Sequence, residues 1–530
     1  MSAHHPPAHV VIGLDVGTTA AKAVAFGIGS PWRHVAVREY PLLEPAPGWQ
    51  VQDPASVLAA AASAVAECSA AAARSDVLAV CVSTAMHGLV GLDAGVRPVT
   101  PLVTWADARA HEQAAWLRTT DDADRLHRVS GTPIHPMTPL TKLMWFARND
   151  PETCARVRWW AGLKDLVLHW LTGTLATELS SASATGLLDA RSGTWSPQAL
   201  DLAGITADQL PPVLPTTSTL GLAADAARRV GLPRGTPVVV GAGDGPLGNV
   251  GTGALTPGVA GLSLGTSGAV RMLVPAPPAD LDRSLFCYAV TEDAWVVGGA
   301  VSNGGIVVRW ATRALAPDLV AAPDGPSADE QLLDLAGSVP PGSDGLLMLP
   351  YLLPERAPLW DPDLPGAYLG LRHGHTRAHL ARAAVEGVAL QLSTIVEALD
   401  GIEPVTTVRA TGGALRSTLW TSVLASAMDR PLVCVGDAEG SALGAAALGL
   451  FALGRAPSLQ AATDALRQPT AAENVVRPDP SSSLVYRRAR NRLPALLASL
   501  AAVAEVFAEP FAEPPQVPAS VTGVRSSSGA

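Results

Sequence analysis

The 530-residue sequence is poor in charged and aromatic residues, which make up 16% and 5% of it. Its 47 acidic residues outnumber its 37 Lys and Arg, so the formal net charge is -10. A protein without a basic surplus cannot neutralise many backbone phosphates of DNA or RNA. The composition therefore argues against a nucleic-acid partner.

Cysteine is scarce as well. The five cysteines are odd in number, scattered, and form no C-x-x-C pair: Cys68, Cys81, Cys154, Cys287 and Cys434. Zinc sites and disulfide frameworks use paired or regularly spaced cysteines. The sequence therefore predicts buried free thiols.

Targeting and membrane signals are also missing from the sequence. The first residues, MSAHHPPAH, contain no cationic segment ahead of an apolar run, unlike a signal peptide. The longest apolar runs, such as the one that starts at Leu493, are shorter than the roughly 18 residues that cross a bilayer. We expect a cytoplasmic protein with no membrane partner.

Apolar residues, in contrast, are abundant at 48% of the sequence. This share can fill a large core, and a chain of this length exceeds what one core supports, so two or more domains are expected. A short motif occurs twice, as GLDVGTT (13–19) and GLSLGTS (261–267), with apolar segments on both sides of each copy. This strand-turn-strand pattern predicts two related hairpins, one opening each half of a duplicated protein with a cleft between the halves.

The domain division follows from this repeat. Pro and Gly in segment 254–258 mark a boundary between an N-terminal domain (10–255) and a C-terminal domain (256–505). Residues 1–9 are expected to be flexible, and residues 506–530, rich in Pro, Ser and Gly, to form a disordered tail. Helical spacing predicts a helix over 378–399, and apolar runs predict strands over 78–84 and 236–243. Alternating strands and helices indicate an α/β fold.

The turn of the first hairpin has the chemistry of a phosphate site. Gly17 lets a ligand approach the backbone, and Thr18 and Thr19 add hydroxyls. Asp15 is an oxygen ligand of the hard type that Mg²⁺ prefers, usually through water, whereas the second hairpin has Ser263 at that place. Either the two turns bind one nucleotide with the metal at the first, or each is an ordinary hairpin turn.

Two further glycine pairs follow apolar segments. VRATGGALRS (408–417) predicts a strand, a Gly-Gly turn and the start of a helix, whose free N–H groups suit an anion or nucleotide. AVSNGGIVVRW (300–310) has a similar turn at Gly304 and Gly305. The alternative is that both pairs only permit close packing.

The segment VVVGAGDGPLGNVG (238–251) satisfies G-x-G-x-x-G after a strand. A dinucleotide site would also need an acidic residue about 20 positions later, and none occurs between Asp244 and Asp280. Asp244 could instead accept a hydroxyl proton during phosphoryl transfer, or merely form a turn.

Taken together, the motifs resemble those of the FGGY family of carbohydrate kinases. The resemblance runs from Val10 to Gly454 and is carried, in chain order, by GLDVGTTAAK, STAMHGLVGLD, TWADARA, GAGDGPLGNVG, LSLGTSGAVR, GGAVSNGG, ATGGALRS and EGSALGAAALG. Three segments most resemble gluconokinases: GTPIHPMTPLTKLMW, SSASATGLLD and PYLLPERAPLWDPDLPGAYLGL.

This resemblance implies two actin-like (ribonuclease H-like) domains, related by internal duplication, that close over ATP and a polyol. It makes Asp244 the catalytic base and Asp15 the Mg²⁺ ligand. The nucleotide contacts that it implies are Gly17, Thr18, Thr19, Lys22, Gly265, Thr266, Ser267, Gly304, Gly412, Gly413 and Ser417. The sugar contacts are Met86, His87, Trp105, Asp107 and Asp244. At Ser417 many relatives have Asn, so this chain departs from the family pattern there.

The implied reaction is ATP-dependent phosphorylation of D-gluconate to 6-phospho-D-gluconate with release of ADP. D-Xylulose or another polyol is the alternative substrate. A gluconate carboxylate needs a cationic or strong donor partner, for which His87, Arg109 and Lys164 are candidates. Two functions from other classes stay open, an NAD-linked oxidoreductase and a nonenzymatic ATP-binding switch, and a homodimer is one candidate assembly.

Overall fold

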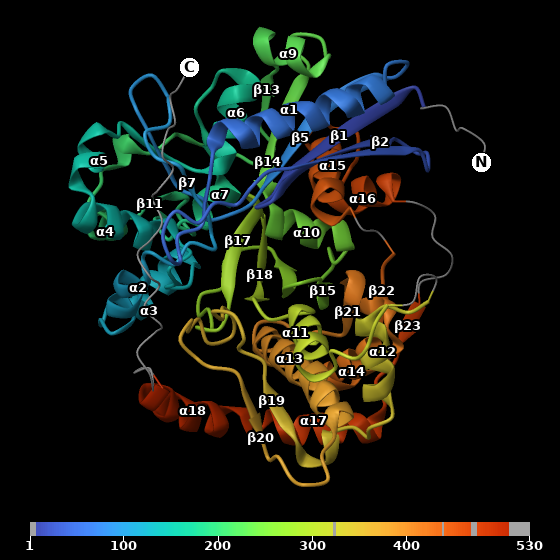
Figure 1. The fold of residues 1–530 in the computed structure, drawn as a ribbon. Coiled ribbons are helices and arrows are strands. Elements are labelled where there is room, and N and C mark those ends of the chain that lie inside the picture. Colours follow the sequence, from blue (N-terminus) through green and yellow to red (C-terminus); the bar gives the residue numbers. More distant parts are fainter. Residues whose placement is uncertain (1–6, 322–324, 437–438, 468–473, 508–530) are drawn as a thin grey trace, which may run out of the picture.

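The computed structural model describes residues 7–321, 325–436, 439–467 and 474–507. These residues form two α/β domains, each built around one mixed sheet, which confirms the predicted fold class (Figure 1). Of the segment expected to be flexible, residues 1–6 lie outside the described part, while His9 already begins the first strand. The predicted disordered tail lies outside it from residue 508 on.

The first sheet has the order β13-β14-β5-β1-β2-β3. Strands β1, β2 and β3 form an antiparallel meander, β1 pairs in parallel with β5, β5 with β14, and β13 closes the edge antiparallel. Their bounds are β1 His9–Val16, β2 Ala20–Gly27, β3 Arg33–Glu39, β5 Asp76–Thr84, β13 Thr219–Gly221 and β14 Pro237–Gly243. Strands β5 and β14 confirm the two strands predicted from apolar runs.

The second sheet has the order β17-β18-β16-β15-β21-β22-β23. Its bounds are β15 Val259–Leu264, β16 Gly268–Val274, β17 Phe286–Thr291, β18 Ala294–Val301, β21 Thr407–Thr411, β22 Leu432–Cys434 and β23 Asn474–Val476. Its pairing repeats that of the first sheet: β15, β16 and β18 form the meander, β15 pairs in parallel with β21 and β21 with β22, and β23 closes the edge antiparallel. The two predicted hairpins, β1–β2 and β15–β16, therefore occupy equivalent central positions.

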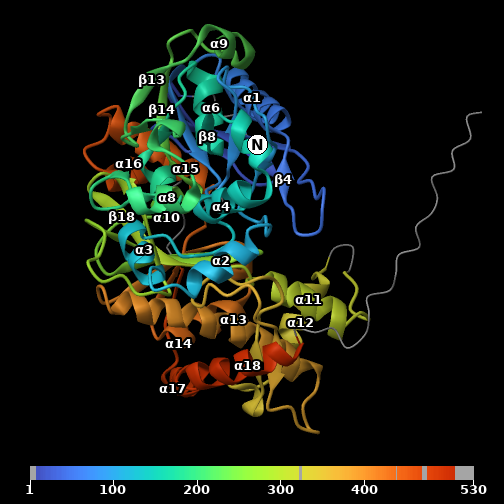
Figure 2. The ribbon, with the colours of Figure 1, turned by 90° about the vertical axis from the view of Figure 1, so that its left-hand side faces the viewer.

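Alternating residues of the central strands face two helical layers. Val10, Ile12 and Leu14 of β1 pack with α1 (Pro54–Ala71), and Val11 points to the layer that contains α15 (Gly440–Ala452). In the second domain, α13 (Arg377–Asp400) is the long helix predicted from apolar spacing. It packs against α11 (Ile306–Leu315), α12 (Ala328–Gly337), α14 (Thr418–Met428) and α17 (Pro480–Arg490), which Figure 2 shows at the end of the molecule opposite α9 (Ala224–Val230).

Shorter elements complete the described chain. The remaining helices are α2 His111–Arg118, α3 Ala123–Ser130, α4 Pro139–Asn149, α5 Pro151–Arg156, α6 Leu163–Thr172, α7 Leu179–Ser183, α8 Pro197–Ala203, α10 Asp244–Thr252, α16 Leu459–Leu466 and α18 Leu493–Phe507, with 3₁₀ turns at Ala207–Gln209, Ser343–Gly345 and Gly413–Arg416. The remaining strands are β4 Val51–Gln52, β6 Val90–Leu92, β7 Leu102–Val103, β8 Trp159–Ala161, β9 Thr177–Glu178, β10 Leu188–Asp189, β11 Thr194–Trp195, β12 Val213–Leu214, β19 Leu347–Leu349 and β20 Ala367–Leu369.

Among the described residues, α1 is the one helix long and apolar enough to cross a membrane by length and composition. The expectation that every apolar run is too short was therefore wrong for this segment. Its buried residues, including Val57, Ala61 and Val65, pack on the first sheet. In this structure α1 is a core helix.

The free thiols have the expected form. All five cysteines are unpaired, and Cys68, Cys81 and Cys287 are buried while the other two are half-buried.

One segment crosses from the second half of the sequence to the first sheet. Helix α15 follows strand β22 of the second domain but packs against β1, β5 and α10 of the first (Figure 1). Glycines make this approach close: a Cβ on Gly13 would lie 2.1 Å from the Ala442 carbonyl oxygen, and one on Gly444 would lie 2.0 Å from that of Leu247. This contact ties the two domains together directly behind the first central hairpin.

We expect Gly444→Ala to lower the free energy of unfolding by about 1–3 kcal/mol, because its methyl group would force α15 away from α10. Urea unfolding of the purified protein measures the change. The matched control is Gly337→Ala at the end of α12, where a Cβ meets no atom within 4 Å. Equal stability of the two variants would contradict the close packing of α15.

Candidate active site

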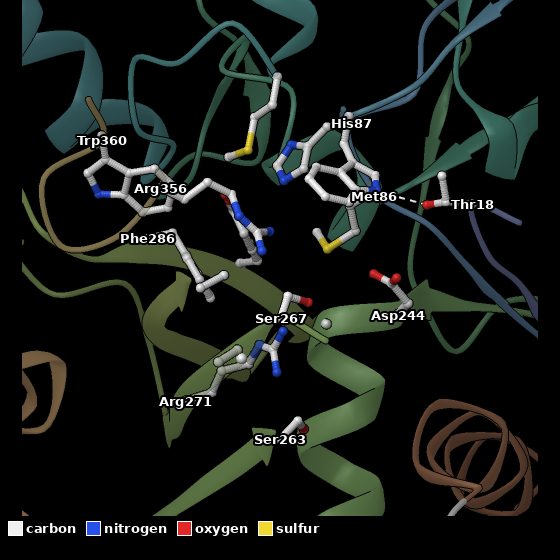
Figure 3. Close-up of a pocket in the computed structure, with 17 residues that line it drawn as sticks. Thr18, Met86, His87, Asp244, Ser263, Ser267, Arg271, Phe286, Arg356 and Trp360 are labelled. Carbon is white, nitrogen blue, oxygen red and sulfur yellow. Dashed lines mark hydrogen bonds between the residues drawn. The ribbon is translucent and has the colours of Figure 1, made fainter. Parts of the chain in front are cut away.

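A cavity of about 290 Å³ lies where the two central hairpins meet (Figure 3). The first domain contributes Thr18, Met86, His87, Trp105, Met137 and Asp244 to its lining. The second domain contributes Ser263, Ser267, Arg271, Phe286, Tyr288, Arg356 and Trp360. The sequence assigned Thr18 and Ser267 to the nucleotide and Met86, His87, Trp105 and Asp244 to the sugar, and the structure brings all six residues to this one cavity.

Asp244 is the first residue of α10 and directly follows β14, so its position is fixed by the end of a central strand. Burial raises the pKa of its carboxyl to about 6, and the nearby Asp15 adds to this shift, whereas Arg271 and Arg356 oppose it. A carboxylate with a pKa slightly below neutrality is suited to accept a proton near pH 7.

Asp15 is the last but one residue of β1, and its Oδ1 accepts a hydrogen bond of 2.7 Å from the Ser83 hydroxyl. Burial raises the pKa of this carboxyl as well, and Lys22 and Lys164 act against the rise. No group of three His, Cys, Asp or Glu side chains that could enclose a metal exists in the described ranges. A single carboxylate fits Mg²⁺ that keeps most of its other ligands as water and phosphate oxygen.

The first hairpin turn is held from several sides. Its backbone accepts hydrogen bonds from Tyr40 Oη to Gly17 O (2.6 Å) and from Gln52 Nε2 to Thr18 O. Trp105 Nε1 donates to Thr18 Oγ1 at 2.8 Å, which joins the turn to the cavity wall. Thr19 is exposed.

Lys22 lies on β2 and forms an ion pair of 3.0 Å with Glu439, the residue that precedes α15. It therefore links the first hairpin to the crossing helix. Lys22 is not part of the lining of the 290 Å³ cavity.

Met86, His87 and Trp105 form one wall of the cavity. His87 has a φ of 63°, and its Nδ1 lies 2.8 Å from the Ala184 carbonyl oxygen. A carbonyl can only accept, so Nδ1 carries the proton and Nε2 is an acceptor. Burial lowers the pKa of His87 to about 3, so the ring is neutral and cannot serve as a cation.

A buried lysine supports this wall. Lys142 donates to the carbonyl oxygens of His87 and Thr104, each at 2.7 Å, and its side chain is fully buried. It thus joins the segments that carry His87 and Trp105.

Three charged residues proposed for the sugar lie elsewhere. Asp107 is not in the cavity lining: both of its carboxylate oxygens bind Arg109, with Nε–Oδ1 at 2.8 Å and Nη2–Oδ2 at 2.9 Å. Arg109 is buried over the Trp49 ring at 3.9 Å. Lys164 is buried and donates to three backbone carbonyls. Of the carboxylate partners considered, only the neutral His87 lines the cavity.

The sequence analysis missed two arginines of the cavity. Arg271 lies on β16, four residues beyond Ser267. Because side chains alternate along a strand, Ser267, Ala269 and Arg271 lie on the same face. The alternation in the sequence could therefore have predicted that Arg271 lies in the site. Its Nε has no hydrogen-bond partner within the part of the chain that the structure describes. Burial lowers the pKa of Arg271 to about 10, so the guanidinium remains charged at neutral pH.

Arg356 belongs to a loop of the second domain. No strand or helix periodicity in the sequence could have predicted its place in the cavity. Its Nε donates to Ser302 Oγ at 3.2 Å and its Nη2 to Val301 O at 2.9 Å, and the guanidinium lies 4.8 Å from the Trp105 ring centre. The preceding Glu355 holds this loop by accepting from Ser302 N and Asn303 Nδ2, both at 2.7 Å. In Figure 3, Trp360 lies at the end of the cavity away from Asp244, and the Arg356 side chain extends from that end toward the middle of the cavity.

The same loop spans the cleft between the domains. His111 Nε2 lies 2.9 Å from Asp363 Oδ1, and Arg118 Nη1 donates to Trp360 O at 3.3 Å. Arg356 and Trp360 are thereby fixed against the first domain.

A second cavity, of about 340 Å³, opens on the other side of the β15–β16 turn. Of the residues predicted to contact a nucleotide, Gly265, Thr266, Gly413 and Ser417 line it, together with Gly305 and Trp420. Ser417 is the N-cap of α14, and its Oγ accepts from Trp420 N at 3.4 Å. The helix predicted directly after the Gly-Gly turn is a 3₁₀ turn, and the α-helix begins only at Thr418.

Gly304 and Gly412 are absent from this lining. A Cβ on Gly304 would lie 2.7 Å from the Ser267 carbonyl carbon, and one on Gly412, whose φ is 126°, would lie 2.1 Å from Leu264 O. Both glycines permit close contact between backbones, which is the packing role that the sequence left open. They shape the second hairpin turn from behind.

Comparisons with known proteins agree on one family. Residues 10–251 match the model of the FGGY family of carbohydrate kinases, N-terminal domain, and residues 260–453 match that of the C-terminal domain. The chain is 36% identical over 461 residues to a gluconokinase of Bacillus subtilis (86% of this chain, 90% of the relative). Two crystal structures from Lactobacillus acidophilus are each 30% identical over 94% of this chain: a gluconate kinase (99% of that chain, TM-score 0.86) and a ligand-bound xylulose kinase (100%, 0.87).

We expect Asp244→Asn to raise the melting temperature above pH 6, because the native state disfavours the ionised carboxylate that the Asn amide replaces. The gain should vanish toward pH 4, since below the ordinary value of 3.8 the carboxyl is protonated in both the folded and the unfolded state. Thermal melts between pH 4 and pH 8 test this, with the exposed Asp121→Asn as the control. A gain that is independent of pH would contradict the assigned shift.

Proposed function

The chain belongs to the FGGY family of carbohydrate kinases, and from this membership we propose that its sugar substrate is D-gluconate, phosphorylated at the 6-hydroxyl with release of ADP. As a member of this family it is a phosphotransferase that uses ATP and acts on a sugar hydroxyl. This excludes the NAD-linked oxidoreductase and the nonenzymatic switch considered from the sequence.

In the proposed mechanism, Asp244 accepts the proton of the sugar hydroxyl. The freed oxygen attacks the γ-phosphorus of ATP in line, a P–O bond forms, and the bond to the β-phosphate oxygen breaks to release ADP. Phosphoryl transfer depends mainly on positioning and charge neutralisation. Asp244 lies between the two hairpins and lines the sugar cavity, so it can orient the hydroxyl as well as take its proton.

The two hairpins are proposed to divide the phosphates. Thr18 and Thr19 of the first turn, with Ser267 of the second, would bind the terminal phosphate on the sugar side. Gly265, Thr266, Gly413 and Ser417 would hold the rest of the nucleotide in the second cavity, whose lining they share.

Mg²⁺ is part of the proposal, with Asp15 as its protein ligand. When bound there, Mg²⁺ would neutralise phosphate charge. The fit rests on the hard carboxylate of Asp15, which lies beside the first hairpin turn and keeps one oxygen beyond the bond from Ser83.

The charge of the sugar cavity is the observation that favours D-gluconate over a neutral sugar. Asp244 is the one acidic residue in the described lining, whereas Arg271 and Arg356 are both cationic and His87 is neutral. Two guanidinium groups therefore face a single carboxylate in this lining, and a cavity with an excess of positive charge favours an anionic substrate over a neutral sugar. The relatives named gluconokinase support this choice, and those named xylulose kinase make D-xylulose the alternative.

Arg356 is the proposed partner of the gluconate carboxylate. Its side chain enters the cavity from the Trp360 end, opposite Asp244 (Figure 3), and an extended six-carbon chain has its carboxylate and its 6-hydroxyl at opposite ends. Arg271 lies closer to the reacting end, because its Nη2 would be 3.3 Å from a Cβ on Gly245. Arg271 is therefore assigned to the transferred phosphate.

The proposal includes a cellular location and an assembly. A cytoplasmic location agrees with the use of ATP, which is an intracellular metabolite. The homodimer stays a prediction.

We expect Arg356→Met to raise KM for gluconate by about 10–100-fold, the range for loss of a charge-assisted hydrogen bond, with little change for D-xylulose. Arg271→Met should instead lower kcat for both substrates. Steady-state kinetics with both sugars measure KM and kcat. Within each variant, D-xylulose serves as the control substrate for D-gluconate. A loss of similar size for both sugars in Arg356→Met would contradict the assigned carboxylate site.

We expect Asp244→Asn to lower kcat about 10²-fold or more, because the amide keeps the shape of the side chain but cannot accept the proton. Affinity for an ATP analogue, measured by calorimetry, should change little. Retention of near-parental turnover would rule out Asp244 as the base.

A further inference from the structure

Strand β14 contains a bulge just before Asp244. Its partner β5 pairs regularly through Val80–Val238 and Cys81–Val239, and the register then shifts so that Ser83 faces Ala242. Val240 and Gly241 thus oppose the single residue Val82. Gly241 has a φ of 74°, and a Cβ there would lie 1.8 Å from Val82 O. Such bulges redirect the residues that follow them, here Gly243 and Asp244.

The Lys164 side chain binds the backbone of this bulge. Its Nζ donates to Val82 O at 2.7 Å, Val240 O at 2.8 Å and Ala242 O at 3.0 Å, which are the carbonyls on both strands at the irregular pairing. An ammonium group has three donors, so all three are used. The side chain is 1% exposed and is absent from the lining of the sugar cavity.

A second contact holds the same stretch. Gly243 N donates to Ser180 Oγ at 3.1 Å, and Ser180 N is held by Glu178 Oε2 at 2.5 Å. Glu178 is fully buried, and its Oε1 lies 4.0 Å from Lys164 Nζ. Glu178 therefore balances the buried charge of Lys164 and also holds Ser180, the residue that binds Gly243.

We propose that Lys164 is a positioning residue that holds the β14 bulge and thereby sets the place of the Asp244 carboxylate, an inference that rests on the proposed role of Asp244. From the sequence, Lys164 was a candidate partner of the gluconate carboxylate, and the positioning role replaces that assignment. Lys164 does not line the sugar cavity, and its hydrogen bonds connect it to the backbone that leads to Asp244.

The test is Lys164→Met in the full-length protein, which removes the charge and three donors but keeps a long side chain. Active sites are counted by calorimetric titration with a nonhydrolysable ATP analogue, so that unfolded protein does not enter kcat. We expect kcat per site to fall by about 10–100-fold, the scale expected for misplacement of a catalytic group, while KM for gluconate and ATP stays within about 3-fold.

A double-mutant cycle with Asp244→Asn decides between positioning and general support of the fold. If Lys164 acts through the Asp244 carboxylate, Lys164→Met causes little further loss of turnover once that carboxylate is gone. An equal fractional loss in both backgrounds would overturn the inference. Failure of the proposed function shows itself differently, because Asp244→Asn alone would then keep parental turnover.

Lys142→Met is the matched control, since Lys142 is equally buried and also donates to backbone carbonyls. Its loss should appear mainly in KM for gluconate, because it supports the wall with His87 and Trp105. The same kinetic pattern in Lys164→Met would overturn the inference.

If Lys164→Met does not fold, Ser180→Ala takes its place, since it removes the bond to Gly243 N and no charge. We expect a fall of kcat per site by about 3–10-fold with KM unchanged, the range for loss of one neutral hydrogen bond, and no further loss in the Asp244→Asn background. Parental kcat in Ser180→Ala would then contradict the inference.

Discussion

The active site depends on a balance of charges that the fold has buried together. Asp15 and Asp244 repel each other at the ends of two central strands, and the repulsion helps to keep the pKa of Asp244 above its ordinary value. Lys164 lies behind both, held by three carbonyls at the bulge of β14, and Arg271 and Arg356 face Asp244 from the second domain. Because each group sits on a strand, a helix end or a tied loop, its distance to the others is set by the backbone.

The duplicated architecture makes this convergence possible. Each sheet places its hairpin at the centre, and the crossing helix α15 brings the end of the second domain against β1 through contacts that only glycine allows. The cavities proposed for the sugar and for the nucleotide lie on opposite sides of the β15–β16 turn. The first cavity therefore lies between two copies of one structural unit, and the first copy supplies Asp244, the proposed base.

Local patterns sufficed to predict the hairpins, α13, β5, β14 and the place of Asp244, because these depend on apolar periodicity and glycine spacing. Arg271 was within reach of the same reasoning through strand alternation. Arg356 and Trp360 were not, because a loop brings them to the cavity from more than 80 residues beyond the end of the second hairpin at Val274. Asp107, Arg109 and Lys164 were misplaced for a related reason: sequence shows a charge but not the partner that already occupies it.

The central claim is that the cavity is built for an anionic sugar, and the kcat/KM ratio of the unmodified enzyme tests it most directly. D-Gluconate and D-xylulose should be compared at saturating ATP and Mg²⁺, because one carries a carboxylate and the other is neutral. The account predicts that gluconate exceeds xylulose by about 10²-fold, the scale of one desolvated charge-assisted contact. An equal or higher kcat/KM for xylulose would contradict it.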